Sequence, residues 1–244
     1  MYISGTVSIV TGGAQGIGKR VAEALVSRGG KVVLGDIQAK GSDVADELNA
    51  KYGMRVAVFH QCDVRNPNSI QALVSQAVGD FGSLDILINA ANTPGTVPWL
   101  DTTGDSISRT IDVNLKAPIE GTRVAVRHFL ANTRKGCVVN VMSMAAFVPD
   151  EAVPVHSAAL RGLVGFTASC ATLALRMPPV RVNSVAPSTV SESNGRLSSD
   201  EVVTQVIRCI VDESLTGDTI KMPLGQPVTL YDGPKAGPKL GSKL

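Results

Sequence analysis

The stretch Thr11-Gly12-Gly13-Ala14-Gln15-Gly16-Ile17-Gly18 decides how this chain is expected to fold. It follows a short apolar run, residues 7–10, that predicts a strand, and it leads into an amphipathic segment, residues 17–27, that predicts a helix. Glycines at 12, 16 and 18 let the backbone turn sharply and lie close to a ligand where a Cβ atom would clash. The start of the helix then offers free N–H groups and a positive dipole end, which suit a pyrophosphate.

Apolar runs alternate with helical segments along the rest of the chain. Strands are expected at 31–35, 55–59, 84–89, 136–142 and 180–185, and helices at 39–52, 66–81, 105–132, 157–176 and 201–212. This alternation predicts a doubly wound parallel α/β sheet of the Rossmann type, with about seven strands and helices on both faces. We expect a single domain over residues 1–230, followed by a flexible tail, 231–244, that is rich in Gly, Pro and Lys.

Composition excludes several classes of function. Of the 244 residues, 44% are hydrophobic and 18% charged, which is ordinary for a folded soluble domain. Three tail lysines contribute +3 to the net charge of +2 and leave the rest of the chain near −1, so no nucleic-acid partner is expected. The four cysteines are scattered and the histidines are not clustered, which predicts neither disulfides nor a metal site. We expect neither a signal peptide nor an apolar run long enough to span a bilayer, so no membrane partner is predicted.

Asp36 ends the second expected strand and bears on the choice of cofactor. A carboxylate there accepts hydrogen bonds from the adenosine ribose hydroxyls and repels a 2′-phosphate, so NAD(H) is favoured over NADP(H). The alternative is an Asp that caps a helix or lies in a solvated turn.

The pattern T-G-x-x-x-G-x-G resembles the short-chain dehydrogenase/reductase family, and the ending Leu215 to Met222 is similar to its NAD-dependent 15-hydroxyprostaglandin-dehydrogenase-like branch. The resemblance implies a set of cofactor-binding residues: Gly12, Gln15, Gly16, Ile17, Gly18, Asp36, Asp63, Val64, Asn89, Ala91, Pro187 and Thr189. Where the family has Asn-Asn-Ala-Gly, this chain has Asn89-Ala90-Ala91-Asn92, which puts a side chain near the expected cofactor path. Asn is the residue after Gly that best tolerates left-handed backbone, so the turn is expected to survive.

The family's catalytic residues are only partly kept. Ser143 stands where the family serine orients the substrate oxygen, and Asn114 matches the asparagine that kinks a helix and holds a proton-relay water. An alternative for Asn114 is a polar residue satisfied within its helix. The family's Tyr-x-x-x-Lys, however, is replaced by His156-x-x-x-Leu160. In the family the tyrosine is the general acid or base, and the lysine lowers its pKa and bonds the nicotinamide ribose.

This replacement leaves three functions open. Leu160 has neither charge nor donor, whereas His156 has a reference pKa of about 6.5 and is able to exchange protons near neutral pH. An NAD(H) enzyme is expected to transfer hydride to or from a small substrate that needs little acid assistance, such as an iminium, a conjugated alkene or a carbonyl. The alternatives are a non-redox cyclase or isomerase of secondary metabolism, and a catalytically silent nucleotide-binding protein. In the last case His156 is a packed helix residue.

Three residues are candidates for contact with the substrate. Trp99 is either a substrate wall or a packing residue of its loop. Asp150 is a carboxylate base near the cleft mouth, a residue that orients His156, or part of a solvated loop, and Leu160 lies at the lost lysine position.

Two further expectations concern assembly and location. Small residues along 157–176 predict a homodimer or homotetramer packed through this helix, as is common in the family. Ser242-Lys243-Leu244 matches the peroxisomal import signal and predicts the import receptor as a partner; the alternative is a repeat that ends this way by chance in a cytoplasmic protein.

Overall fold

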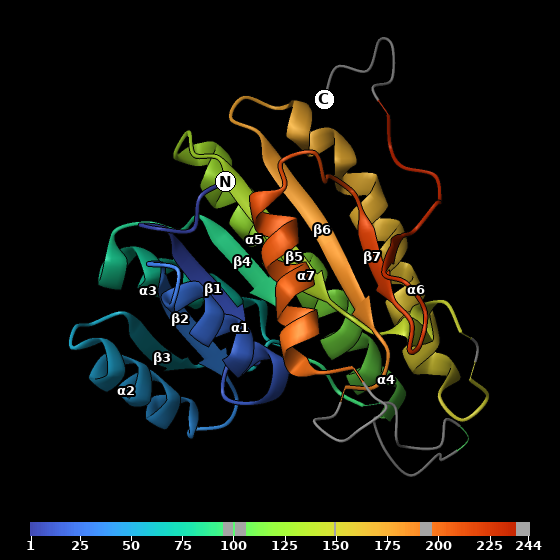
Figure 1. Cartoon of the computed structure of the whole chain (residues 1–244), viewed down its shortest axis with the longest axis horizontal. Helices are drawn as coiled ribbons and strands as arrows, with labels where there is room; N and C mark the ends of the chain where they lie inside the picture. Colours follow the sequence, from blue (N-terminus) through green and yellow to red (C-terminus); the bar gives the residue numbers. More distant parts are fainter. Residues whose placement is uncertain (95–99, 101–105, 149, 191–196, 238–244) are drawn as a thin grey trace.

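A twisted parallel sheet forms the centre of the computed structural model (Figure 1), which describes residues 1–94, 100, 106–148, 150–190 and 197–237. Its strands are β1 (Val7–Thr11), β2 (Lys31–Asp36), β3 (Ala57–Gln61), β4 (Ile86–Asn89), β5 (Gly136–Val141), β6 (Val180–Pro187), β7 (Thr219–Met222) and β8 (Thr229–Leu230). The described part of the chain thus forms eight strands in the order β3-β2-β1-β4-β5-β6-β7-β8. All neighbours are parallel except β7 and β8, which are antiparallel.

Helices cover both faces of the sheet, which confirms the doubly wound architecture. The described α-helices are α1 (Gly16–Val26), α2 (Gly41–Tyr52), α3 (Pro67–Phe81), α4 (Ser106–Ile111), α5 (Ala117–Ala131), α6 (Pro154–Ser169) and α7 (Ser199–Val211). One core lies between the sheet and α1, α2 and α7, and the other lies under α3 and α5. Side chains alternate between these cores along a strand: Val10 of β1 enters the first, whereas Val7 and Ile9 enter the second.

The direction in which the strands are added reverses between β1 and β4, which are neighbours in register with Thr11 opposite Asn89. In open α/β sheets the chain leaves the carboxyl ends of two such strands toward opposite faces, and a crevice forms between the departing loops. The glycine-rich turn follows β1 and the Ala90–Asn92 segment follows β4, so both border this crevice.

Two predicted helices differ in detail. The long helix expected at 105–132 is interrupted by a π-helical segment, Asp112–Lys116, between α4 and α5. The helix expected at 157–176 begins earlier, at Pro154, and its last turns, Cys170–Leu175, are 3₁₀.

This second helix corrects one expectation. By length and composition the run Pro154–Leu175 would suffice to cross a membrane, which the sequence analysis did not foresee. Its inner face, which includes Leu160, Leu163 and Val164, packs into an apolar cluster with Met142 and Ala186 of the sheet region.

The C-terminal segment contacts the body of the protein along its described part. Strand β8 adds to the edge strand β7, the Tyr231 amide donates to the Thr219 carbonyl, and the Ala236 amide donates to the Ala168 carbonyl of α6. Figure 1 shows this segment running beside α6. Residues 238–244, and with them Ser242-Lys243-Leu244, lie outside the described residues, so the predicted flexible end stays a prediction.

Candidate active site

Three glycines shape the turn after β1, each for a different reason. A Cβ on Gly18 would lie 2.1 Å from the Gly12 carbonyl oxygen, so this position has no room for a side chain. Gly12 has φ +69°, and its Cβ would lie 2.8 Å from the backbone of Ala91. Gly16 has φ +54° but nothing within 4 Å of its Cβ position. Gly12 and Gly18 therefore bring the backbone together, whereas Gly16 leaves the cleft open.

The first turn of α1 faces this cleft without a side-chain cap. Gln15 occupies the N-cap position in an extended conformation and makes no capping hydrogen bond, and no acidic residue lies in the first turn. Its Oε1 instead accepts from Nζ of Lys40 at 2.6 Å. The N–H groups at the start of α1 are therefore free of side-chain partners and fit an anionic phosphate.

Asp36 is held rigidly at the end of β2. One carboxylate oxygen accepts from the Ala14 amide and the other from the Gln38 amide, both at 3.0 Å. The residue is 7% exposed and lines the cleft. A carboxylate oxygen has two lone-pair sites, so each oxygen is able to accept one further bond, as from ribose hydroxyls.

The end of the cleft beside β3 contains two arginines that the sequence analysis missed. Arg65 donates hydrogen bonds from Nε and Nη2 to the Asp63 carboxylate, at 2.6 to 3.0 Å. These hydrogen bonds from Arg65 lower the pKa of Asp63, and the charge of Arg109 on α4 adds to the effect. The sequence could have indicated Arg65, because a cationic residue two positions after Asp63 is able to pair with it. Arg109 approaches Asp63 only when the chain is folded.

The cleft has a volume of about 480 Å³, within the range of small-molecule sites. Nine of the twelve predicted cofactor residues line it: Gly12, Gln15, Gly16, Ile17, Gly18, Asp36, Asp63, Val64 and Ala91. Asn89, Pro187 and Thr189 are not among its lining residues. Asn89 is buried, and its amide donates to Asn140 Oδ1 at 2.8 Å and to the Pro118 carbonyl at 3.3 Å. It therefore links the end of β4 to β5 and α5.

Asn92 lines the cleft but does not use left-handed backbone. Among the described non-glycine residues, Thr133 alone has a positive φ. The turn after β4 therefore needs no glycine at 92, and the departure from the family pattern is accommodated. The glycine turn, the uncapped helix and Asp36 together fit a nicotinamide dinucleotide.

Asn114 is buried in the π-helical segment, which confirms the expected distortion of this helix. Such segments are frequent at functional sites. Its Oδ1 accepts from the Thr93 amide and its Nδ2 donates to the Thr93 carbonyl, both at 2.9 Å. Nδ2 also lies 2.9 Å from Nδ1 of His156. Thr93 lines the cleft, so a single hydrogen-bonded step connects the cleft wall to Asn114, and a second connects Asn114 to His156.

These contacts fix the tautomer of His156. The Thr93 amide is an obligate donor and the Thr93 carbonyl an obligate acceptor, so the Asn114 side chain has one favourable orientation. Its Nδ2 must then donate to Nδ1 of His156, which leaves the proton of a neutral imidazole on Nε2. Burial lowers the pKa of His156, which favours this neutral form.

Ser143 and Leu160 occupy different surroundings. Ser143 is the N-cap of a 3₁₀ turn, Met144–Ala146, and its Oγ accepts from the Ala145 amide at 3.2 Å. It directly follows Met142, which lines the cleft, while no hydrogen bond joins it to His156. Leu160 is 2% exposed inside the apolar cluster.

The remaining candidates are placed less centrally. Asp150 is exposed, and its carboxylate accepts from the Ala152 amide, as in a capped loop turn. Trp99 lies outside the described residues. Within the described ranges, no group of three or more His, Cys, Asp or Glu side chains could hold a metal ion.

Comparison with known proteins agrees with this geometry. Residues 6–201 match the family described as short chain dehydrogenase. The chain is 32% identical to short chain dehydrogenase helC of Aspergillus fumigatus, over 93% of this chain and 98% of the relative. It is 34% identical to 15-hydroxyprostaglandin dehydrogenase [NAD(+)] of Macaca fascicularis, over 78% of this chain and 70% of the relative.

The fold is also similar to that of a solved short chain dehydrogenase from Mycobacterium smegmatis. The TM-score is 0.81 at 28% identity, with 93% of this chain and 95% of the other chain covered.

Proposed function

Because this chain belongs to the short-chain dehydrogenase family, a family of oxidoreductases, we propose that it binds NAD(H) and transfers hydride to or from a small organic substrate without the usual Tyr/Lys pair. The observation that carries this proposal is the 2.9 Å contact between Asn114 and His156 beside an intact dinucleotide cleft. The substrate class that fits is an iminium, a conjugated alkene or an activated carbonyl.

The chemistry follows from the tautomer of His156. A neutral imidazole with its proton on Nε2 is a hydrogen-bond donor, so it is able to polarise a substrate heteroatom, which is one part of the missing tyrosine's task. It is a poor general base in this state, because Nε2 already holds its proton and Nδ1 is occupied by Asn114. Substrates that accept hydride with little proton transfer are therefore favoured over unactivated ketones. The bound NAD(H) supplies the hydride; the chain orients and polarises the acceptor.

The choice of NAD(H) over NADP(H) rests on Asp36. Its two oxygens are fixed by backbone amides, so it has no freedom to turn away from a 2′-phosphate. Calorimetric titration is expected to show NADH binding at least tenfold tighter than NADPH binding. Asp36→Ala should reduce the ratio of the NADPH to the NADH dissociation constant. Asp43→Ala, which changes an exposed Asp in the first turn of α2, should leave this ratio unchanged. If wild-type protein binds neither nucleotide, the redox proposal fails.

Hydride transfer is tested with 4,4-dideuterated NADH and two probes, cinnamaldehyde as a conjugated carbonyl and 3,4-dihydroisoquinoline as a cyclic imine. Deuterium in the product supports the proposal. His156→Gln should lower turnover by about 10²–10³-fold, as for the loss of one hydrogen-bond donor, while NADH binding persists. The matched control is His128→Gln, which changes a histidine on α5 whose Nδ1 lies beside Asn132 and not beside Asn114.

A second candidate is non-redox catalysis in the same pocket, as a cyclase or isomerase. It is favoured by Leu160, which is buried in an apolar cluster and offers no ammonium group like the one that pairs with the nicotinamide ribose in the family. Substrate conversion without deuterium transfer would favour it. NADH binding with no conversion of any kind would favour a silent nucleotide-binding protein.

We also propose that the import receptor of peroxisomes reads Ser242-Lys243-Leu244. Fluorescence polarisation of a labelled peptide of residues 231–244 with the receptor's peptide-binding domain tests this. Binding should be lost when Leu244 is removed.

A further inference from the structure

The C-terminal segment 229–237, here called the C-terminal strap, is attached to the body at both ends. At its start, β8 pairs with β7 and Tyr231 packs against Phe147, with ring centroids 5.0 Å apart. At its end, the Ala236 amide donates to α6 at Ala168. Phe147 immediately follows the 3₁₀ turn that Ser143 caps, so the strap contacts the residue next to this turn.

Arg161 joins the strap, the turn and α6. Its guanidinium carbon lies 5.3 Å from the Phe147 ring centroid and 5.4 Å from that of Tyr231, so it contacts both aromatic side chains. The same guanidinium donates to the Ala146 carbonyl and to the Tyr231 hydroxyl, both at 3.4 Å. Arg161 also directly follows Leu160, whose side chain shares an apolar cluster with Ala146.

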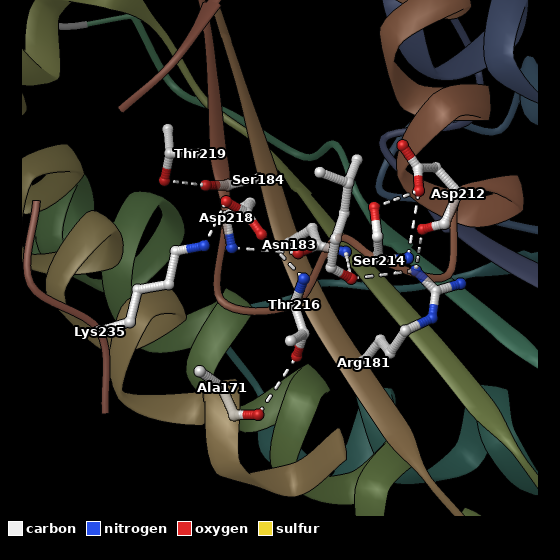
Figure 2. Close-up of polar contacts among 11 residues, drawn as sticks. Ala171, Arg181, Asn183, Ser184, Asp212, Ser214, Thr216, Asp218, Thr219 and Lys235 are labelled. Carbon is white, nitrogen blue, oxygen red and sulfur yellow. Dashed lines mark hydrogen bonds and ion pairs between the residues drawn. The ribbon is translucent and has the colours of Figure 1, made fainter. Parts of the chain in front are cut away.

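Lys235 fastens the far part of the strap to a buried acid. Its ammonium pairs with Asp218, whose side chain is 5% exposed. Asp218 is itself fixed: its other oxygen accepts from the Thr216 amide at 2.8 Å, and its own amide donates to Asn183 of β6 at 3.1 Å. Figure 2 shows Lys235 reaching from the strap toward this network at the amino end of β7.

We propose that Tyr231 and Arg161 are positioning residues that hold the turn carrying Ser143 through Phe147, and that Lys235 anchors the strap which brings Tyr231 there. This inference rests on the proposed function only in so far as Ser143 is a catalytic residue. The turn is short, and the amides of Ala145 to Val148 bond only to Ser143 and Met144 within the turn itself, so its order depends on the side chains that pack against it.

Amide hydrogen exchange tests the inference directly. The Phe147 and Val148 amides both donate to the Met144 carbonyl, at 2.8 and 3.0 Å, and so report opening of the turn. Tyr231→Ala is expected to accelerate their exchange at least tenfold, and Lys235→Ala should act in the same direction. Tyr231→Phe, which keeps the ring, should restore wild-type rates. The matched control is Tyr52→Ala at the end of α2, which should leave these amides unchanged.

Two results would overturn the inference: unchanged exchange at Phe147 and Val148 in Tyr231→Ala, or an acceleration of equal size in β1 and β4. In the hydride-transfer assay Tyr231→Ala should lower kcat with NADH affinity unchanged, and Tyr231→Phe should restore it. Absence of hydride transfer in the wild type contradicts the proposed function, whereas the exchange measurement still decides the role of the strap.

Discussion

Nδ2 of Asn114 lies 2.9 Å from Nδ1 of His156, and the backbone of Thr93 fixes which way the asparagine amide points. His156 is thereby tied to an asparagine of the π-helical segment. A neutral imidazole held this way carries its proton on Nε2 and is a hydrogen-bond donor through that atom.

The first prediction reverses this hydrogen bond. Asn114→Asp replaces the Nδ2 donor with a carboxylate, so Nδ1 of His156 should acquire a proton and the pKa of His156 should rise. The ¹⁵N resonances of the imidazole report both changes. Asn132→Asp is the control, because Asn132 lies beside Nδ1 of His128 at 3.3 Å on another part of the surface. Unaltered His156 resonances in Asn114→Asp would contradict the assigned tautomer.

The second prediction concerns stability against pH. Burial lowers the pKa of His156, and burial together with the charge of Arg134 lowers that of His128. The unfolded chain therefore takes up protons first as pH falls through about 6.5, so the free energy of unfolding should decrease from pH 7.5 to 5.5.

Urea midpoints at these two pH values measure the effect. His156→Gln and His128→Gln should each show a smaller decrease than the wild type. Ordinary carboxylates titrate near pH 4, so they contribute little in this window. Identical decreases in wild type and both variants would rule out the histidines as its source.

The third prediction separates two glycines of the same turn. Gly16→Ala should cost about 1–2 kcal/mol of stability, because Ala must adopt left-handed backbone in otherwise open space. Gly18→Ala should cost more, because its Cβ meets the Gly12 carbonyl. Chemical denaturation measures both. Gly16→Ala should in addition weaken NADH binding, because the new methyl group enters the cleft. Equal losses of stability in the two variants would contradict the prediction that only Gly18 lacks room for a side chain.

The fourth prediction concerns a buried cation beneath α7. Arg181 of β6 is 7% exposed and donates to the carbonyls of Cys209, Ile210, Asp212 and Leu215. Figure 2 shows the Arg181 guanidinium beside Asp212, the residue that follows α7. Arg181→Met fills similar space but leaves the carbonyls unpaired, so a loss of about 3–5 kcal/mol is expected from urea unfolding. Arg20→Met, at an exposed site on α1, should cost far less.

Much of the fold was predictable from residues that act locally. The glycine turn and the alternation of apolar runs with helices depend on backbone freedom and burial, which a sequence displays directly. Strand β8 was not predictable, because two residues between prolines and glycines carry no periodic signal. These residues form a strand only because β7 offers an edge with which they pair.

The site was predictable only in outline. Asn114 and His156 lie 42 positions apart, and the orientation of the asparagine depends on the backbone of Thr93. Neither the tautomer nor the contact of Arg109 with the cleft follows from spacing along the chain.

The last prediction concerns assembly. Ala158, Gly162, Gly165 and Ser169 are exposed along one face of α6, where a second copy would find room to approach closely. A Cβ on Gly165 meets nothing within 4 Å, so Gly165→Glu should leave the isolated chain folded. It should nevertheless convert a dimer to a monomer in light scattering, because the new charge would be buried against the partner helix. Gly79→Glu is the matched control, since Gly79 is an exposed helical glycine of α3 with equally open space. A Gly165→Glu protein that assembles like Gly79→Glu would exclude this face of α6 from the interface.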